Sequence, residues 1–185
     1  RNVVAGDIIY SLTDDNLLAY STGDSEVRTF DCLTQLNGIK VSQIAYSTAA
    51  KRLIIAYDDC NIDLMNSAGE VLNLSALRDK SMTSKTLNGL CVEGKMAYLA
   101  MSFGVVEVDM QEGVFRNTYI LDQNVQSVTL LNGSIYAATA QGVLRGKLSD
   151  NLQDKSKWTT TAGGNFKQLI AMGTEIIARA HVNLY

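Results

Sequence analysis

The fold is decided by residues 90–119, which read LCVEGKMAYLAMSFGVVEVDMQEGVFRNTY. Apolar residues in this stretch follow a period of two and form four short segments separated by turns that carry glycine and polar residues. Such alternation predicts strands, and short turns between strands predict antiparallel pairing. The predicted strands cover residues 90–92, 96–100, 105–108 and 114–119. Residues 90–119 therefore predict one four-stranded antiparallel unit.

The same pattern returns along the chain with a period of about forty residues. Equivalent positions in the second strand of successive units are Tyr10, Ile54, Tyr98, Tyr136 and Ile177, at intervals of 44, 44, 38 and 41 residues. Four-stranded units of this length are typical of β-propeller blades. A β-sandwich, the alternative, would show regular turn spacing without this second repeat. We therefore predict an all-β fold, a β-propeller, with helix expected only near residues 75–84.

The predicted blades cover about residues 1–38, 39–84, 85–122, 123–163 and 164–185. This amounts to four and a half blades, whereas propellers close with roughly four to eight, and seven blades of this size would need about 290 residues. The sequence begins at Arg1 and stops after an alternating segment, so we expect a piece of a larger, seven-bladed propeller. An open edge would also favour self-association through exposed strands and one apolar blade face.

Composition excludes several classes of function. The chain has 185 residues, of which 46% are hydrophobic, which is ample material for a packed core. Its net charge of −3 leaves no basic excess to bind a nucleic acid backbone, so no nucleic acid partner is expected. No apolar run is long enough for a membrane-spanning helix. The single histidine, His181, excludes most histidine-based catalysis, so we predict no enzyme, no catalytic residues and no cofactor.

Two acidic pairs, Asp14-Asp15 and Asp58-Asp59, occupy equivalent predicted turns. Paired carboxylates can contribute oxygen ligands to a hard cation, but such a site usually needs six or more oxygens. Asp also favours tight turns because its side chain bonds to the local backbone. We therefore interpret both pairs as turn residues and predict no metal site.

The three cysteines, Cys32, Cys60 and Cys91, lack the CxxC spacing and the companion histidines of a zinc site. A disulfide between Cys32 and Cys60 is one open alternative, and Cys91 lies among apolar residues as a small buried side chain would. Trp158 also has two interpretations. It could lie in the core between blades or form part of a carbohydrate-stacking surface.

A family resemblance is carried by five segments, which read RLIIAY at 52–57, NIDL at 61–64, DKSMT at 79–83, KMAYLA at 95–100 and FGVVEVD at 103–109. They resemble the N-terminal propeller of PorZ-type proteins, surface-attachment components of type IX secretion in Bacteroidota. They also resemble the two-component-regulator propeller repeats of that phylum. The resemblance implies an exported, cell-surface or periplasmic scaffold with protein partners in a secretion or attachment complex, and binding of anionic lipopolysaccharide or another glycan. An oligosaccharide-sensing propeller of a hybrid two-component regulator is the open alternative.

Strand direction predicts where a partner would bind. In an antiparallel four-stranded blade, the turn between strands two and three lies on the same face as the connection to the next blade. The longest such connection, residues 75–86, carries four candidate binding residues, Arg78, Lys80, Met82 and Lys85. Long loops on a rigid scaffold often carry function, and cations suit an anionic ligand. The alternative is a solvated loop or a short helix that seals the junction between blades.

Overall fold

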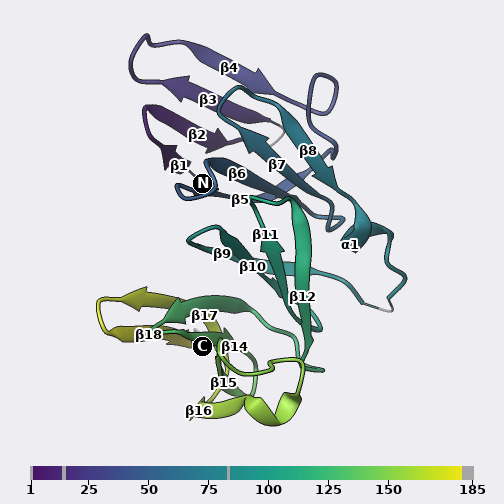
Figure 1. Cartoon of the computed structure of the whole chain (residues 1–185), viewed down its shortest axis with the longest axis vertical. Coiled ribbons are helices and arrows are strands. Elements are labelled where there is room, and N and C mark those ends of the chain that lie inside the picture. Colours follow the sequence, from purple (N-terminus) through teal and green to yellow (C-terminus); the bar gives the residue numbers. More distant parts are fainter. Residues whose placement is uncertain (1, 14–15, 83, 181–185) are drawn as a thin grey trace, which may run out of the picture. The chain divides into compact units, whose positions relative to one another are not determined.

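The computed structural model describes residues 2–13, 16–82 and 84–180. Within these ranges the chain forms four four-stranded antiparallel sheets and one two-stranded sheet (Figure 1). The helical segments of the described residues are α1 (Ala76–Asp79) and the 3-10 turn η1 (Lys155–Lys157). The all-β prediction is confirmed, and α1 lies where the sequence predicted a short helix.

Each four-stranded sheet is a simple meander, so neighbouring strands in the chain are hydrogen-bonded neighbours in the sheet. The first two sheets contain β1 (Asn2–Ala5), β2 (Ile8–Leu12), β3 (Leu17–Ser21) and β4 (Val27–Phe30), then β5 (Val41–Ser47), β6 (Arg52–Tyr57), β7 (Ile62–Asn66) and β8 (Val71–Leu74). The third sheet contains β9 (Leu87–Glu93), β10 (Met96–Met101), β11 (Gly104–Asp109) and β12 (Val114–Ile120). The fourth contains β13 (Ser127–Leu131), β14 (Ser134–Ala138), β15 (Gly142–Lys147) and β16 (Thr159–Gly163), and the fifth contains β17 (Phe166–Met172) and β18 (Glu175–Ala180).

The chain divides into two compact units. The N-terminal unit comprises Arg1–Thr83, Val92–Ala97 and Asp109–Val114. The C-terminal unit comprises Ser84–Cys91, Tyr98–Val108 and Phe115–Tyr185. Each unit is described separately below.

The predicted equivalent positions have the same place in each sheet. Each is the third residue of the second strand of its own sheet, and this holds for Tyr10, Ile54, Tyr98, Tyr136 and Ile177. The sequence repeat therefore corresponds to a repeat of strand and register, as predicted.

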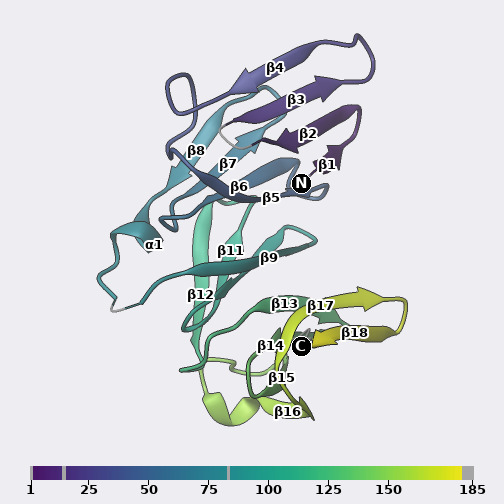
Figure 2. The same cartoon turned by 180° about the vertical axis from the view of Figure 1, so that it is seen from behind.

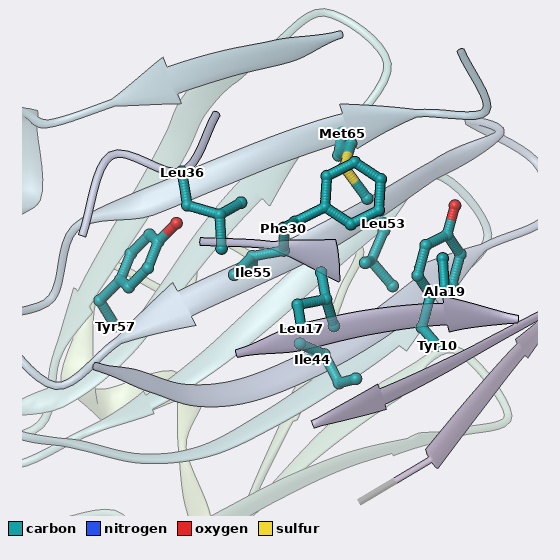
Figure 3. Packing of buried hydrophobic residues seen from close by; sticks show 10 residues of the cluster. All are labelled: Tyr10, Leu17, Ala19, Phe30, Leu36, Ile44, Leu53, Ile55, Tyr57 and Met65. Carbon is teal, nitrogen blue, oxygen red and sulfur yellow. The ribbon is translucent and has the colours of Figure 1, made fainter. Parts of the chain in front are cut away.

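The core of the N-terminal unit lies between the first and second sheets (Figure 3). Leu17 and Ile44 are fully buried, and the rings of Tyr10 and Phe30 lie in the same cluster. Burying one such side chain stabilises the fold by about 1.5–3 kcal/mol. Both faces of β6 are buried, because Leu53 and its neighbours alternate in direction and all are inaccessible to solvent.

In the C-terminal unit, β17 packs against β13 and β14, and Figures 1 and 2 show the fifth sheet beside the fourth. Leu169 of β17 contributes to a small cluster with Ala138 and Val143. Trp158 is 9% exposed, and its ring centroid lies 6.1 Å from that of Tyr119. Its indole Nε1 donates to the carbonyl of Leu152 at 3.0 Å. The core interpretation of Trp158 is therefore correct, and the stacking-surface interpretation is wrong.

Candidate binding surface

The turns between second and third strands are hydrogen-bonded to the connections that follow fourth strands, as strand direction predicted. These backbone bonds occur in both compact units, and each bond lies within one unit. They run from Asp58 N to Lys40 O at 3.1 Å, from Ser102 N to Thr86 O at 2.9 Å, from Leu121 N to Phe103 O at 2.9 Å, and from Gly164 N to Gln141 O at 3.3 Å. Turns and connections therefore form a shared, hydrogen-bonded surface in each unit.

The predicted binding connection, residues 75–86, is divided between the two units. Arg78, Lys80 and Met82 belong to the N-terminal unit, and Lys85 belongs to the C-terminal unit. Arg78 and Lys80 are exposed, whereas Met82 and Lys85 are half-buried. In the helix α1, Leu77 is buried and Arg78 is exposed.

The charge of Arg78 is partly compensated by its neighbour. Its Nε donates to Asp79 Oδ1 at 2.9 Å, and this hydrogen bond raises the pKa of Arg78. Both side chains are exposed, and exposed ion pairs of this kind contribute little stability. Lys80 is the other exposed cation of residues 76–82.

The N-terminal unit also contains a pocket of about 140 Å³ between the first and second sheets. Its lining includes the buried aromatic rings of Tyr10 and Phe30 and also Gly69 of the β7–β8 turn. At the rim, the Arg28 guanidinium donates twice to the Glu26 carboxylate, both times at 3.2 Å. The pocket is too small to enclose a whole sugar ring, but aromatic rings beside polar groups can contact the apolar face of one while the polar groups bind its hydroxyls.

The sequence does not indicate this pocket, because its walls come from two sheets. Tyr10, Arg28 and Phe30 lie in the first sheet, whereas Gly69 lies in the second. One sequence signal was present. Arg28 and Phe30 are two residues apart in β4, and this spacing places both side chains on the same side of the strand.

Asp63 of β7 is a fully buried carboxylate with four hydrogen bonds. Its Oδ2 accepts from the Asn37 backbone N–H at 2.8 Å and from Tyr57 Oη at 2.5 Å. Its Oδ1 accepts from Asn37 Nδ2 at 3.0 Å and Asn73 Nδ2 at 2.7 Å. Burial, and then the hydrogen bond to Asp63, raise the pKa of Tyr57. All four hydrogen bonds come from groups of the fold itself, on Asn37, Tyr57 and Asn73, so Asp63 has the environment of a structural carboxylate.

Glu107 of β11 is the corresponding buried carboxylate in the C-terminal unit, with 9% exposure. Its Oε2 accepts from Asn117 Nδ2 at 2.6 Å and from Tyr119 Oη at 2.9 Å. Burial, followed by the charge of Glu107, raises the pKa values of Tyr98 and Tyr119. These partners are strand residues, so Glu107 also has a structural environment.

The acidic pair Asp58-Asp59 lies in a turn and bonds to neighbouring groups, as predicted. Asp59 Oδ1 accepts from the Asn61 backbone N–H at 2.9 Å, and Asp58 Oδ2 lies 2.6 Å from Lys40 Nζ. Asp14 and Asp15 lie outside the described residues. Within residues 2–13, 16–82 and 84–180, no three His, Cys, Asp or Glu side chains are grouped closely enough to hold a metal ion.

None of the three cysteines forms a disulfide, so the alternative of a Cys32–Cys60 disulfide is wrong. Cys32 is exposed and Cys60 is buried, whereas Cys91, expected to be buried, is half-buried. None of the helices in the described part of the chain is long and apolar enough to cross a membrane.

Comparison with solved structures identifies proteins of the same architecture. PorZ of Porphyromonas gingivalis, described as an essential surface component of the type IX secretion system, matches with 32% identity and a TM-score of 0.87. The match covers 96% of this chain and 25% of PorZ, so this chain spans about a quarter of that protein. No match was found among curated proteins.

More distant structures share the fold alone. The extracellular domain of the putative hybrid two-component system BT4673 from B. thetaiotaomicron matches with a TM-score of 0.75 and 13% identity, over 96% of this chain and 25% of that one. The WD40 repeats of RRP9 match with a TM-score of 0.70 and 13% identity, over 93% and 53% of the two chains. A family model, the N-terminal β-propeller domain of PorZ, matches residues 9–159. This chain therefore belongs to the PorZ N-terminal β-propeller family.

Proposed function

We propose that this chain is a non-enzymatic binding scaffold of an exported, cell-surface or periplasmic protein. It would bind protein partners of a type IX secretion or attachment complex, together with anionic lipopolysaccharide. The observation that carries the proposal is the 32% identity to PorZ over 96% of this chain, because PorZ is described as a surface component of that system.

The arrangement of the candidate residues supports binding more than chemistry. The buried carboxylates Asp63 and Glu107 are engaged by structural donors. The turns and connections, in contrast, form hydrogen-bonded surfaces on rigid sheets. Rigid sheets that present loops are a common basis for recognition. The connection at residues 75–86, with Arg78, Lys80, Met82 and Lys85, is the proposed contact for an anionic ligand.

The test reverses the charges of this connection with Arg78→Glu, Lys80→Glu and Lys85→Glu combined. Binding to immobilised anionic lipopolysaccharide is measured by surface plasmon resonance, with a neutral dextran surface as reference. We expect affinity to fall at least tenfold, with stability changed by no more than about 1 kcal/mol, the usual scale for surface changes.

A matched control reverses three exposed cations outside the connection, Lys51, Lys95 and Arg116. It changes the net charge by the same amount, so it measures the general electrostatic contribution. Equal weakening in both triple variants, unchanged binding, or loss of folding in the first would each contradict the proposed role of residues 75–86.

A second candidate function, sensing of an oligosaccharide, is favoured by the pocket at Tyr10 and Phe30. A neutral oligosaccharide that binds there should lose affinity in Arg28→Ala and keep it in Lys51→Ala, as measured by calorimetry. Equal affinity in both variants would remove this candidate.

A further inference from the structure

The C-terminal unit contains a pocket of about 200 Å³ at the connection between β15 and β16. Its lining consists of Arg145, Lys147, Asp150, Ser156, Lys157 and Thr159. The pocket is smaller than the roughly 300–1,000 Å³ of sites that enclose a whole small molecule. Its size therefore fits one charged group better than an entire ligand.

Strand register brings these side chains to one face. Arg145 and Lys147 are two residues apart on β15, so their side chains point the same way. Arg145 is paired with Thr159 across the β15–β16 ladder, and directly paired residues share a face. Lys157 and Ser156 come from η1, immediately before β16. One face therefore presents three cations and two hydroxyl groups.

Arg145 is held in place by neutral groups. Its Nε and Nη2 donate to Ser134 Oγ at 3.2 and 3.1 Å. The guanidinium carbon lies 5.8 Å from the centroid of the Tyr136 ring. A hydroxyl group and an aromatic face orient a guanidinium without neutralising its charge. Arg145 is therefore oriented at the pocket by partners that carry no negative charge.

The charges at the pocket are unbalanced. Among the described residues, none of Arg145, Lys147 and Lys157 has a carboxylate within salt-bridge distance, and Asp150 is the one acidic residue of the lining. The adjacent Lys155 forms an ion pair with Asp122. The nearby Asp154 accepts from the Ser156 backbone N–H at 2.9 Å and lies in the field of Lys157. Three cations thus face one lining carboxylate in a chain whose net charge is −3.

We propose that this pocket binds the phosphate or sulfate group of an anionic ligand, with Arg145, Lys147 and Lys157 supplying charge and Ser156 supplying a hydroxyl donor. The Thr159 hydroxyl donates to the Arg145 carbonyl at 3.4 Å and lines the pocket. Guanidinium and ammonium groups bind such oxyanions through short, charge-assisted hydrogen bonds. The volume left beside the oxyanion can admit part of the sugar or lipid that carries it. The site depends on its own geometry and does not require the connection at residues 75–86.

The test titrates the ¹⁵N-labelled chain with inorganic phosphate, inorganic sulfate, glucose 6-phosphate and glucose, and follows the amide resonances by NMR. We expect saturable shifts centred on residues 145–159 with the first three probes and none with glucose. Tighter binding of glucose 6-phosphate than of phosphate would assign the site to a phosphorylated saccharide, and the reverse order would assign it to the free ion. Absence of saturable shifts with all three anions would overturn the proposal.

The matched variants separate a site from general attraction. The double variant Lys147→Gln/Lys157→Gln should weaken binding at least tenfold, whereas Lys155→Gln, at the paired neighbour, should change it less than twofold. Equal weakening in both would contradict the site. Should the double variant fail to fold, Ser156→Ala serves as the second test, because it removes one donor and no charge. Its binding should weaken about threefold, and unchanged binding would remove Ser156 from the site.

Discussion

The buried carboxylates of the two units connect different parts of the chain. Asp63 receives hydrogen bonds from Asn37, which lies 26 residues earlier in the sequence, in the connection that precedes the second sheet. Glu107 receives hydrogen bonds from Asn117 and Tyr119, both on β12, the strand next to its own. Asp63 therefore attaches a long connection to the sheet, whereas Glu107 joins two strands that already share a backbone ladder. Similar chemistry thus gives a long-range crosslink in one unit and a local one in the other.

The largest expected effect comes from removing each carboxylate. Asp63→Ala removes the acceptor of four hydrogen bonds, among them the bond from the buried Tyr57 hydroxyl, and should destabilise the protein by about 4 kcal/mol. Glu107→Ala removes the acceptor of two hydrogen bonds, from Asn117 and Tyr119, and should destabilise it by about 2 kcal/mol. Urea denaturation followed by far-UV circular dichroism measures both, with the exposed Asp7→Ala as control. Equal losses at Asp63 and Glu107 would contradict the distinction between a long-range and a local crosslink.

A glycine packs close to one tyrosine of the Asp63 network and another glycine packs close to one tyrosine of the Glu107 network. A Cβ on Gly104 would lie 1.9 Å from the Tyr119 carbonyl oxygen, and Gly104 has a φ of +150°. A Cβ on Gly38 would lie 2.4 Å from Cδ1 of the Tyr57 ring. Because a backbone carbonyl yields less than a side chain, Gly104→Ala should cost about 3 kcal/mol and Gly38→Ala about 2 kcal/mol.

Thermal unfolding of the two glycine variants measures this difference. Gly94→Ala, whose Cβ would meet no atom within 4 Å, separates the effect of a positive φ from that of a steric clash. A smaller loss for Gly104→Ala than for Gly94→Ala would show that the carbonyl of Tyr119 moves freely.

The smallest expected effect is on the pH dependence of stability. The pKa values of Tyr57, Tyr98 and Tyr119 are raised above the unfolded value of about 10, first of all by burial. The stability they contribute is complete below pH 10 and is lost as pH rises above it, by about 1.4 kcal/mol per pH unit for each tyrosine. Tyr57→Phe should therefore remove the contribution of one tyrosine to the pH dependence of stability. The double variant Tyr98→Phe/Tyr119→Phe should remove the contributions of two.

Urea midpoints at several pH values between about 8 and 11 give these slopes. Tyr20→Phe, at an exposed tyrosine, is the control variant. An identical slope in the wild type and in Tyr57→Phe would mean that Tyr57 ionises without opening the fold.

Much of the fold could be predicted because it depends on local pattern. The period of two and the glycine-containing turns placed Tyr98 and Tyr136 at the same position of successive second strands, and the structure has them there. The face shared by turns and connections followed from strand direction alone. Both properties need only residues that are close in sequence.

The polar sites could not be predicted in the same way. Residues 62–65 of β7 are all buried, so alternation could not indicate that Asp63 faces a buried network. Its partner Asn37 is supplied by a connection whose path depends on the packed sheets. The cations of the β15–β16 pocket are likewise scattered in sequence, and only the pairing of Arg145 with Thr159 brings them together. The sequence favoured residues 75–86 because their charges are adjacent in the chain, a property that does not require a pocket.

The environment of the Tyr57 ring also sets a time scale for motion. The ring is 1% exposed, and a Cβ on Gly38 would lie 2.4 Å from Cδ1 and 2.8 Å from Cε1 of the ring, so the Gly38 backbone packs closely against it. A half-turn of the ring about its Cβ–Cγ bond leaves the hydroxyl near Asp63 but sweeps the ring edges through the space that the Gly38 backbone occupies. The ring can therefore flip only when the connection of residues 31–40 moves away. The flip rate of one aromatic ring, which NMR line shapes can measure, would thus report how often that connection opens.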